Sequence, residues 1–162
     1  MNGLDHASYR LASSILASNS EMTLATLRVD GSPHASTVSF ASDGLVLYAA
    51  IALDSHKAHE IREDGRASLT VNAPFDNWNQ IQGLSIDGTA SIIDWPRGQE
   101  KAGALLLKKL PSYVALVGKS PPVPWPGMVF IRIVPAVLTL LDYTKRFGHT
   151  TQFNIVDLEE LQ

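Results

Sequence analysis

Residues 22–51 read MTLATLRVDGSPHASTVSFASDGLVLYAAI, and this stretch decides the fold class of the chain. It contains three apolar runs separated by two Asp-Gly pairs, at 30–31 and 43–44. An Asp-Gly pair between alternating apolar runs is the strongest short-range signal for a β-hairpin. The stretch therefore predicts three strands that form an antiparallel meander, at 22–29, 34–41 and 45–51.

The remaining segments add helices and further strands. Apolar residues at helical spacing, or a proline in the first turn, predict three helices, at 4–18, 55–63 and 96 to about 110. Alternating apolar residues predict strands at 66–73 and 81–94, and two more within 128–143 that are separated at Pro135. The segment after residue 143 is mixed and polar, and no strand is predicted there.

Six or seven strands in a chain of 162 residues indicate a small barrel, because closure removes exposed sheet edges. The fold class expected is mostly β with flanking helices (α+β), as a single domain over residues 1–162. The proline-rich stretch 119–127, KSPPVPWPG, is predicted to be extended or turned. It is not a domain boundary, because the segment that follows is too short to form its own core.

The composition excludes several classes of protein. The chain is 45% hydrophobic, carries a net charge of −3 and has a pI near 5.9, which argues against a nucleic-acid binder with its usual basic stripe. It contains no cysteine, so disulfides and thiolate metal sites are excluded and a cytoplasmic location is expected. We expect no signal peptide at the N-terminus, and no apolar run reaches the roughly 18 residues of a membrane span.

The start of the helix predicted at 55–63 carries a hydroxyl, an imidazole and an ammonium group, from Ser55, His56 and Lys57. A helix N-terminus favours anions, because its first N–H groups are unpaired and its dipole is positive there. The combination suggests a phosphate site. The alternative is that Ser55 caps the helix and that the two basic side chains are solvated.

Other familiar sites have little support. His56 and His59 are three residues apart, but no third ligand stands at a suitable spacing, so surface histidines are favoured over a zinc site. The chain has no G-x-S-x-G elbow for hydrolysis. It also lacks the G-x-G-x-x-G and G-x-x-x-x-G-K patterns of nucleotide folds.

Two loops combine aromatic and charged residues. Trp78 stands in the polar segment FDNWNQ, where it is either a stacking surface or a loop anchor. The segment YTKRFGH, residues 143–149, brings cations and aromatic rings together after the last predicted strand. Such a loop suits a planar anionic ligand, and a solvated basic tail is the alternative.

The ordered pieces TLATLRVDGSPHASTVSF, LVLYAA, SHKAHEIREDGRASLTV and GLSIDGTASII, within residues 22–93, resemble the pyridoxamine 5′-phosphate oxidase-like family of FMN-binding split barrels. The segment FIRIVPAVLTLLDYTKRFGH also looks like the ending of many small members. The resemblance implies a six-stranded antiparallel split barrel, a homodimer, and two FMN sites at the dimer interface.

The resemblance also implies roles for individual residues. Ser55, His56 and Lys57 match the helix start that holds the flavin phosphate, and Ser36 stands where the family often has an arginine that reaches the same phosphate. Arg146 would steady negative charge on the reduced ring. The other residues implied to line the cofactor are Thr37, Val38 and Ser39 under the ring edge, Tyr48 and Ala49 near the ribityl chain, and Gln82 and Gly83 from the other subunit.

The ending LDYTKRFGH lacks the Glu, Trp and Arg-Leu-His residues with which true pyridoxamine 5′-phosphate oxidases bind their substrate. We therefore expect an FMN-dependent oxidoreductase that acts on a small substrate other than vitamin B6. Three alternatives stay open. They are a haem-binding or haem-degrading protein with His149 as axial ligand, an F420-dependent reductase, for which the chain has few basic residues, and a non-enzymatic flavin carrier.

Overall fold

The computed structural model describes residues 2–156 and 158. Its helices are α1 (His6–Ser18), α2 (His56–Glu63), α3 (Pro96–Lys109) and the short α4 (Val114–Val117), with 3₁₀ turns η1 (Trp78–Gln80) and η2 (Pro111–Tyr113). Its strands are β1 (Asn2–Gly3), β2 (Glu21–Leu27), β3 (Pro33–Ser39), β4 (Ala41–Asp43), β5 (Val46–Ala52), β6 (Arg66–Asn72), β7 (Gln82–Ile92), β8 (Met128–Asp142) and β9 (Thr150–Asn154). The three predicted helices are confirmed to within two residues at each end.

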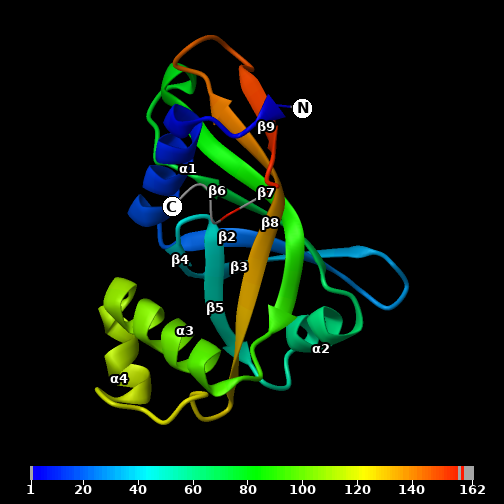
Figure 1. The fold of residues 1–162 in the computed structure, drawn as a ribbon, viewed down its shortest axis with the longest axis vertical. Coiled ribbons are helices and arrows are strands. Elements are labelled where there is room, and N and C mark those ends of the chain that lie inside the picture. The colour runs from blue at the N-terminus through cyan, green and yellow to red at the C-terminus, as the bar shows by residue number, and fades with distance from the viewer. Residues whose placement is uncertain (1, 157, 159–162) are drawn as a thin grey trace.

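One bent sheet contains all the strands of the described residues (Figure 1). Seven of them follow the order β1-β9-β8-β7-β6-β2-β3, and β4 and β5 join from the side, through the pairing of β5 with β8. The long strand β8 is its centre, with β7 along one edge. The other edge of β8 pairs with β5 in its first part and with β9 in its last part. The sheet therefore divides where β5 gives way to β9, which is the split barrel predicted from the sequence.

The strand count differs from the expected six. Seven strands of the described residues have five or more residues, and β1 and β4 are shorter. Among the seven longer strands, the one that was not predicted is β9, whose only large apolar side chain is the buried Phe153. Its two threonines, Thr150 and Thr151, are β-branched and favour strands, but a single apolar residue gives no alternation to detect.

Both Asp-Gly hairpins are confirmed, and their glycines have the positive φ that such turns need, 82° at Gly31 and 58° at Gly44. The predicted three-strand meander is wrong. The chain leaves β3 at Phe40, which is fully buried, and β4 then pairs with β5, which turns away to join β8. Burial of Phe40 in the core explains why the strand predicted at 34–41 bends before its end.

The predicted break at Pro135 is also wrong, because β8 is one continuous strand. Pro135 pairs with Gly88 of β7, and Ala136 is an extra residue that forms a β-bulge opposite Asp87. A Cβ atom on Gly88 would lie only 2.1 Å from the carbonyl oxygen of Val134. The strand thus accommodates a proline because the bulge bends it and the facing residue has no side chain.

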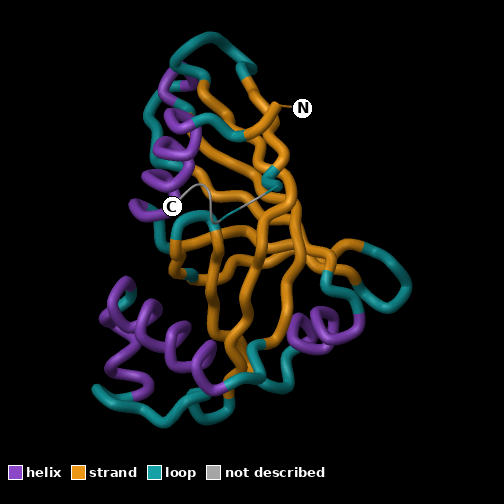
Figure 2. Tube along the Cα trace, in the orientation of Figure 1, coloured by secondary structure: helices purple, strands orange, loops and turns teal. Residues whose placement is uncertain are grey.

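The core consists of two clusters. The larger one fills the barrel and is covered by α1 and α2, through residues such as Leu16 and Ile61. The smaller one lies between β5, β8 and α3, and contains Trp125 from the proline-rich stretch, 1% exposed. Figure 2 shows α3 and α4 on the same side of the molecule as this stretch. Within the described residues, no helix is both long and apolar enough to cross a membrane.

Candidate functional site

The start of α2 is held in place by Ser55. Its hydroxyl donates to the carbonyl of Ala52 at 2.8 Å and accepts the N–H of Ala58 at 3.1 Å. Ser55 is therefore the N-cap of the helix, as the simpler interpretation predicted. Because its one proton is used by Ala52, the groups free to donate to an anion at this end are backbone N–H groups and the neighbouring side chains.

Lys57 is the buried cation of this helix start, at 9% exposed. Its ammonium group donates to the hydroxyl of Ser36 on β3. Burial lowers the pKa of Lys57, and the charge of Glu60 partly opposes this. Among the described residues Lys57 makes no ion pair with a carboxylate.

Glu60 lies one turn further along α2 and is 5% exposed. It accepts hydrogen bonds from the hydroxyl of Thr26 on β2, at 2.6 Å, and from Nδ1 of His34 on β3, at 3.0 Å. Burial by itself would raise the pKa of Glu60. The hydrogen bonds from Thr26 and His34 together have a larger effect in the opposite direction, so the pKa is lowered overall. The carboxylate stays ionised and ties α2 to two strands.

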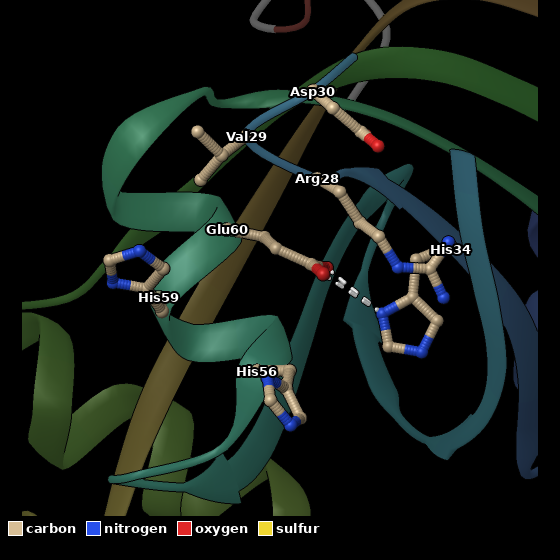
Figure 3. A pocket seen from close by; sticks show the side chains of 7 residues that line it. All are labelled: Arg28, Val29, Asp30, His34, His56, His59 and Glu60. Atoms are coloured by element: carbon tan, nitrogen blue, oxygen red, sulfur yellow. Dashed lines mark hydrogen bonds and ion pairs between the residues drawn. The ribbon is translucent and has the colours of Figure 1, made fainter. Parts of the chain in front are cut away.

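The contact between Glu60 and His34 borders a cleft of about 630 Å³ between α2 and the β2–β3 turn (Figure 3). Figure 3 shows Glu60 reaching across to His34. The cleft is lined by Arg28, Val29, Asp30, His34, His56, His59 and Glu60. No group of three or more His, Cys, Asp or Glu side chains that could hold a metal ion occurs in the described part of the chain. His56 and His59 both line this cleft.

Sequence reasoning missed His34, Thr26 and Glu60. The spacing of polar residues in the sequence could have indicated two contacts, Lys57 with Ser36 and Glu60 with His34. His34 and Ser36 are two residues apart on a strand and share one face, while Lys57 and Glu60 are three apart on a helix and share another. Two polar pairs at these spacings indicate a helix packed on a strand through polar contacts.

The predicted residues of β3 and β5 contribute in different ways. Thr37 is exposed, Val38 packs against the main core and Ser39 is half-buried. Because β3 stands at one end of the sheet path, its outer edge has backbone groups that no neighbouring strand of this path pairs with. Tyr48 is buried in the cluster beneath α3, and Ala49 is fully buried in the main core, so these two would reach a ligand only through their backbone.

Gln82, Gly83 and Arg146 lie at the other end of β8. The start of α2 follows Ala52, which pairs with Met128, whereas Gln82 pairs with Asp142. These two positions, Met128 and Asp142, are about 45 Å apart when measured along the strand at its usual rise. Figure 1 shows α2 and the loop after β8 at opposite ends of the molecule. The structure thus divides the predicted residues into a helix-start group (Ser36, Ser55, His56 and Lys57) and a loop group (Gln82, Gly83 and Arg146).

The loop group is organised by Asp142, which the sequence analysis did not identify. Asp142 is 8% exposed, and its Oδ1 accepts from the backbone N–H and hydroxyl of Thr144 and from Nε2 of Gln82 at 3.2 Å. Burial by itself would raise the pKa of Asp142. The hydrogen bonds from Thr144 and Gln82 together have a larger effect in the opposite direction, so the pKa is lowered overall. Because Nε2 of Gln82 is used by Asp142, its Oε1 is left as an acceptor.

Gly83 and Arg146 complete the loop group. A Cβ atom on Gly83 would lie 2.4 Å from Oδ1 of Asn72, so this strand start allows a close approach. Arg146 is exposed on the turn after β8. His149 follows it, with Nδ1 buried and without a hydrogen-bond partner in the described residues, beside a small cavity of about 170 Å³ under α1.

The sheet and its flanking helices are those of a split barrel, with a capped helix start that favours anions beside β3. The family model described as pyridoxamine 5′-phosphate oxidase matches residues 12–136. The chain therefore belongs to this family. No curated protein matches the sequence.

Solved structures share the fold at low identity. A protein from Clostridium acetobutylicum, related to general stress protein 26 of B. subtilis and assigned to the pyridoxinephosphate oxidase family, is 14% identical, with a TM-score of 0.69 over 98% of this chain and 100% of that one. A heme-binding protein from Mycobacterium smegmatis is 17% identical, with a TM-score of 0.74 over 95% of this chain and 60% of that one. HutZ, the heme storage protein from Vibrio cholerae, is 12% identical, with a TM-score of 0.63 over 87% and 89%.

Proposed function

We propose that this chain binds FMN in a site shared by two copies and acts as a flavin-dependent oxidoreductase on a small substrate. The observation that carries this is Lys57, a buried cation beside a capped helix start with no carboxylate ion pair in the described residues. A buried ammonium group is costly unless it is paired. A phosphate dianion would supply the missing partner, together with the first N–H groups of α2.

The residues of the helix-start group would hold the flavin phosphate in different ways. Lys57 and His56 would bind the phosphate, while Ser55 fixes the direction of the helix N–H groups by capping α2. Ser36 holds the Lys57 ammonium in position. When bound, FMN would supply the hydride and electron transfer chemistry, and the protein would supply orientation and charge.

The loop group would contact the ring of the flavin. The free Oε1 of Gln82 can accept from an N–H group of a planar ring, and the exposed guanidinium of Arg146 can stabilise negative charge on it. In one chain these residues lie at the Asp142 end of β8, whereas α2 follows the strand β5, whose Ala52 pairs with Met128 at the other end. A homodimer would bring the helix-start group of one copy to the loop group of the other. The absence of cysteine suits action in the cytoplasm.

An absorbance spectrum from 300 to 600 nm, taken before and after FMN is added and the excess removed, tests cofactor binding. We expect the bands of oxidised flavin to co-elute with a dimer. A spectrum that FMN does not change would refute the proposal. Reduction of the bound flavin by candidate donors, followed by reoxidation with candidate substrates, would then separate an enzyme from a flavin carrier.

Mixed dimers test the shared site. A Lys57→Ala chain and a Gln82→Ala/Arg146→Ala chain should each bind FMN weakly alone. When the two are unfolded together and refolded, each mixed dimer regains one site in which both groups are intact. Statistical pairing makes about half of the dimers mixed, so about a quarter of all sites should recover wild-type affinity. Recovery of none would show that the two groups do not form a site shared between copies.

Haem binding is the second candidate, and the buried Nδ1 of His149 is the observation that favours it. A histidine nitrogen without a partner can serve as a metal ligand. The neighbouring cavity, about 170 Å³, is smaller than the roughly 300 Å³ at which ligand pockets usually begin. Haem titration tests this, because a Soret band that persists in His149→Ala would exclude His149 as the ligand.

A further inference from the structure

The proposed function leaves most of the cleft between α2 and the β2–β3 turn without a role. Of the seven described residues that line this cleft, only His56 belongs to the helix-start group. Its volume of about 630 Å³ is in the usual range of small-molecule sites, roughly 300–1,000 Å³. The groups that face the cleft decide which kind of molecule it suits.

The cleft is separate from the contact between Lys57 and Ser36. Lys57 contacts Ser36 on β3. Glu60, one helical turn later, contacts His34 on the same strand. His34 and Ser36 are two residues apart, which is about 7 Å along a strand. His34 is among the described residues that line the cleft, and Lys57 and Ser36 are not. The cleft therefore lies beyond the proposed phosphate contact, toward the β2–β3 turn.

His34 is held in one tautomer by Glu60. Its Nδ1 lies 3.0 and 3.1 Å from the two carboxylate oxygens of Glu60. In spite of burial, hydrogen bonds lower the pKa of Glu60, so its carboxylate is ionised and only accepts. Nδ1 must then carry the proton, which leaves Nε2 of the neutral ring as an acceptor. Figure 3 shows Nε2 turned away from Glu60, and the side chain of His34 is 26% exposed.

Arg28 brings a positive charge to the same cleft. Its Nη1 donates to the carbonyl of Pro33 at 2.9 Å, which fixes the direction of the side chain. Because Pro33 precedes His34, the guanidinium and the imidazole line the same part of the cleft. None of the ion pairs in the described part of the chain involves Arg28. A guanidinium without a carboxylate partner suits a carboxylate ligand, which it can bind through two N–H groups.

The cleft thus combines a guanidinium, an acceptor nitrogen and the apolar side chain of Val29, which is 84% exposed. We infer that it binds a small 2-hydroxycarboxylate with an apolar substituent, whose carboxylate contacts Arg28 and whose hydroxyl donates to Nε2 of His34. The two contact groups are neighbours, so they suit a hydroxyl and a carboxylate on adjacent carbons. Glu60 and Asp30 already place negative charge in the cleft, so a single carboxylate fits it better than a phosphate dianion.

Glu60 is a positioning residue in this site, because it acts on the ligand only through His34. The inference does not rest on the proposed function, since Lys57 takes no part in it. Mandelate that binds to a protein unable to take up FMN would support the inference and refute the proposed function.

An NMR titration of the purified protein with mandelate, followed through backbone amide signals, tests the inference. Signals of residues 28–34 and 56–60 should shift and saturate, and those of residues 143–149 should not. Phenylacetate lacks the hydroxyl and methyl mandelate lacks the charge, so each should bind about tenfold more weakly. If no shift saturates, or if phenylacetate binds as tightly as mandelate, the inference is overturned.

Two substitutions assign the contacts. Arg28→Gln should raise the Kd for mandelate about tenfold, and the matched control Arg97→Gln, at an exposed arginine of α3, should leave it unchanged. His34→Asn keeps an N–H group for Glu60 but removes Nε2, so the preference for mandelate over phenylacetate should disappear.

A preference that persists in folded His34→Asn would contradict the inference, and so would wild-type affinity in Arg28→Gln. Circular dichroism checks the fold of both variants. If His34→Asn does not fold, Arg28→Gln still decides the outcome, because Arg28 is exposed.

Discussion

Two buried carboxylates, Glu60 on α2 and Asp142 at the end of β8, organise the two groups of the candidate site in different ways. Glu60 accepts from Thr26 and His34, which are 34 and 26 residues away in the sequence. Asp142 accepts from Thr144, two residues away, and from Gln82, which lies across the β7–β8 pair. Both carboxyls have a lowered pKa, because hydrogen bonds outweigh burial.

The two carboxylates differ in how far apart in the sequence and in the fold their hydrogen-bond partners lie. Glu60 joins a helix to two strands, so it supports the tertiary structure around the proposed phosphate site. Asp142 shapes one turn and orients one amide, so it supports local geometry. We therefore expect changes at the helix-start end to affect stability and binding together, and changes at the loop end to affect mainly what the loops contact.

The largest expected effect concerns stability. Glu60→Ala should lower the free energy of unfolding by about 3 kcal/mol, because two buried hydrogen bonds to a charged group are lost and His34 loses its partner. Asp142→Ala should lower it by about 1.5 kcal/mol, because most of its partners can turn to water. Urea unfolding monitored by circular dichroism measures both values.

Glu60→Gln is the control for shape, because it keeps the side-chain size and can still bond Thr26. Its cost should fall between those of the wild type and Glu60→Ala. Equal losses for Glu60→Ala and Asp142→Ala would contradict the comparison between a long-range and a local carboxylate.

The next effect concerns FMN affinity. Lys57→Ala should weaken FMN binding by roughly 1.5–3 kcal/mol, because a charge-assisted contact to the phosphate is lost. Isothermal titration calorimetry measures the change. Lys108→Ala, at an exposed lysine on α3, is the matched control and should leave the affinity unchanged. If both variants bind FMN equally well, the helix start holds no phosphate.

The pH dependence of stability distinguishes the two carboxylates more finely. A carboxyl whose pKa is lower in the folded than in the unfolded chain stabilises the fold above its unfolded pKa. That contribution is lost as the pH falls through the folded pKa. Stability should therefore decline as the pH drops below the ordinary values, 4.5 for Glu60 and 3.8 for Asp142.

Denaturant titrations between pH 3 and pH 7 measure this decline. Glu60→Gln should flatten it from about pH 4.5 downward, and Asp142→Asn only at lower pH. A profile that neither substitution alters would mean that other carboxyls carry the acid dependence.

The smallest effect separates a helix cap from a phosphate ligand. Ser55→Ala should cost about 1 kcal/mol of stability, and Ser55→Gly only a few tenths, as is usual at an N-cap. Because the Ser55 proton is used by Ala52, Ser55→Gly should also leave FMN affinity nearly unchanged. A large loss of affinity in a stable Ser55→Gly protein, measured by titration, would show that the hydroxyl rotates to meet the phosphate.

The sequence predicted the parts of this protein that depend on near neighbours. Both Asp-Gly hairpins and the three longer helices follow from turn residues, caps and apolar spacing, which act over a few residues. Family membership followed from the order of these pieces and from the Ser-His-Lys helix start. The strand β9 was missed, because a single buried phenylalanine gives no pattern.

Tertiary structure alone decided what depends on distant contacts. The continuous course of β8 past Pro135 needed a glycine on the facing strand, and the path from β3 to β5 needed a core that buries Phe40. The sequence also did not predict that the candidate site residues divide into two groups. The helix-start group lies between α2 and β3, whereas the loop group lies at the last residues of β8, because strand pairing and not sequence order sets their separation.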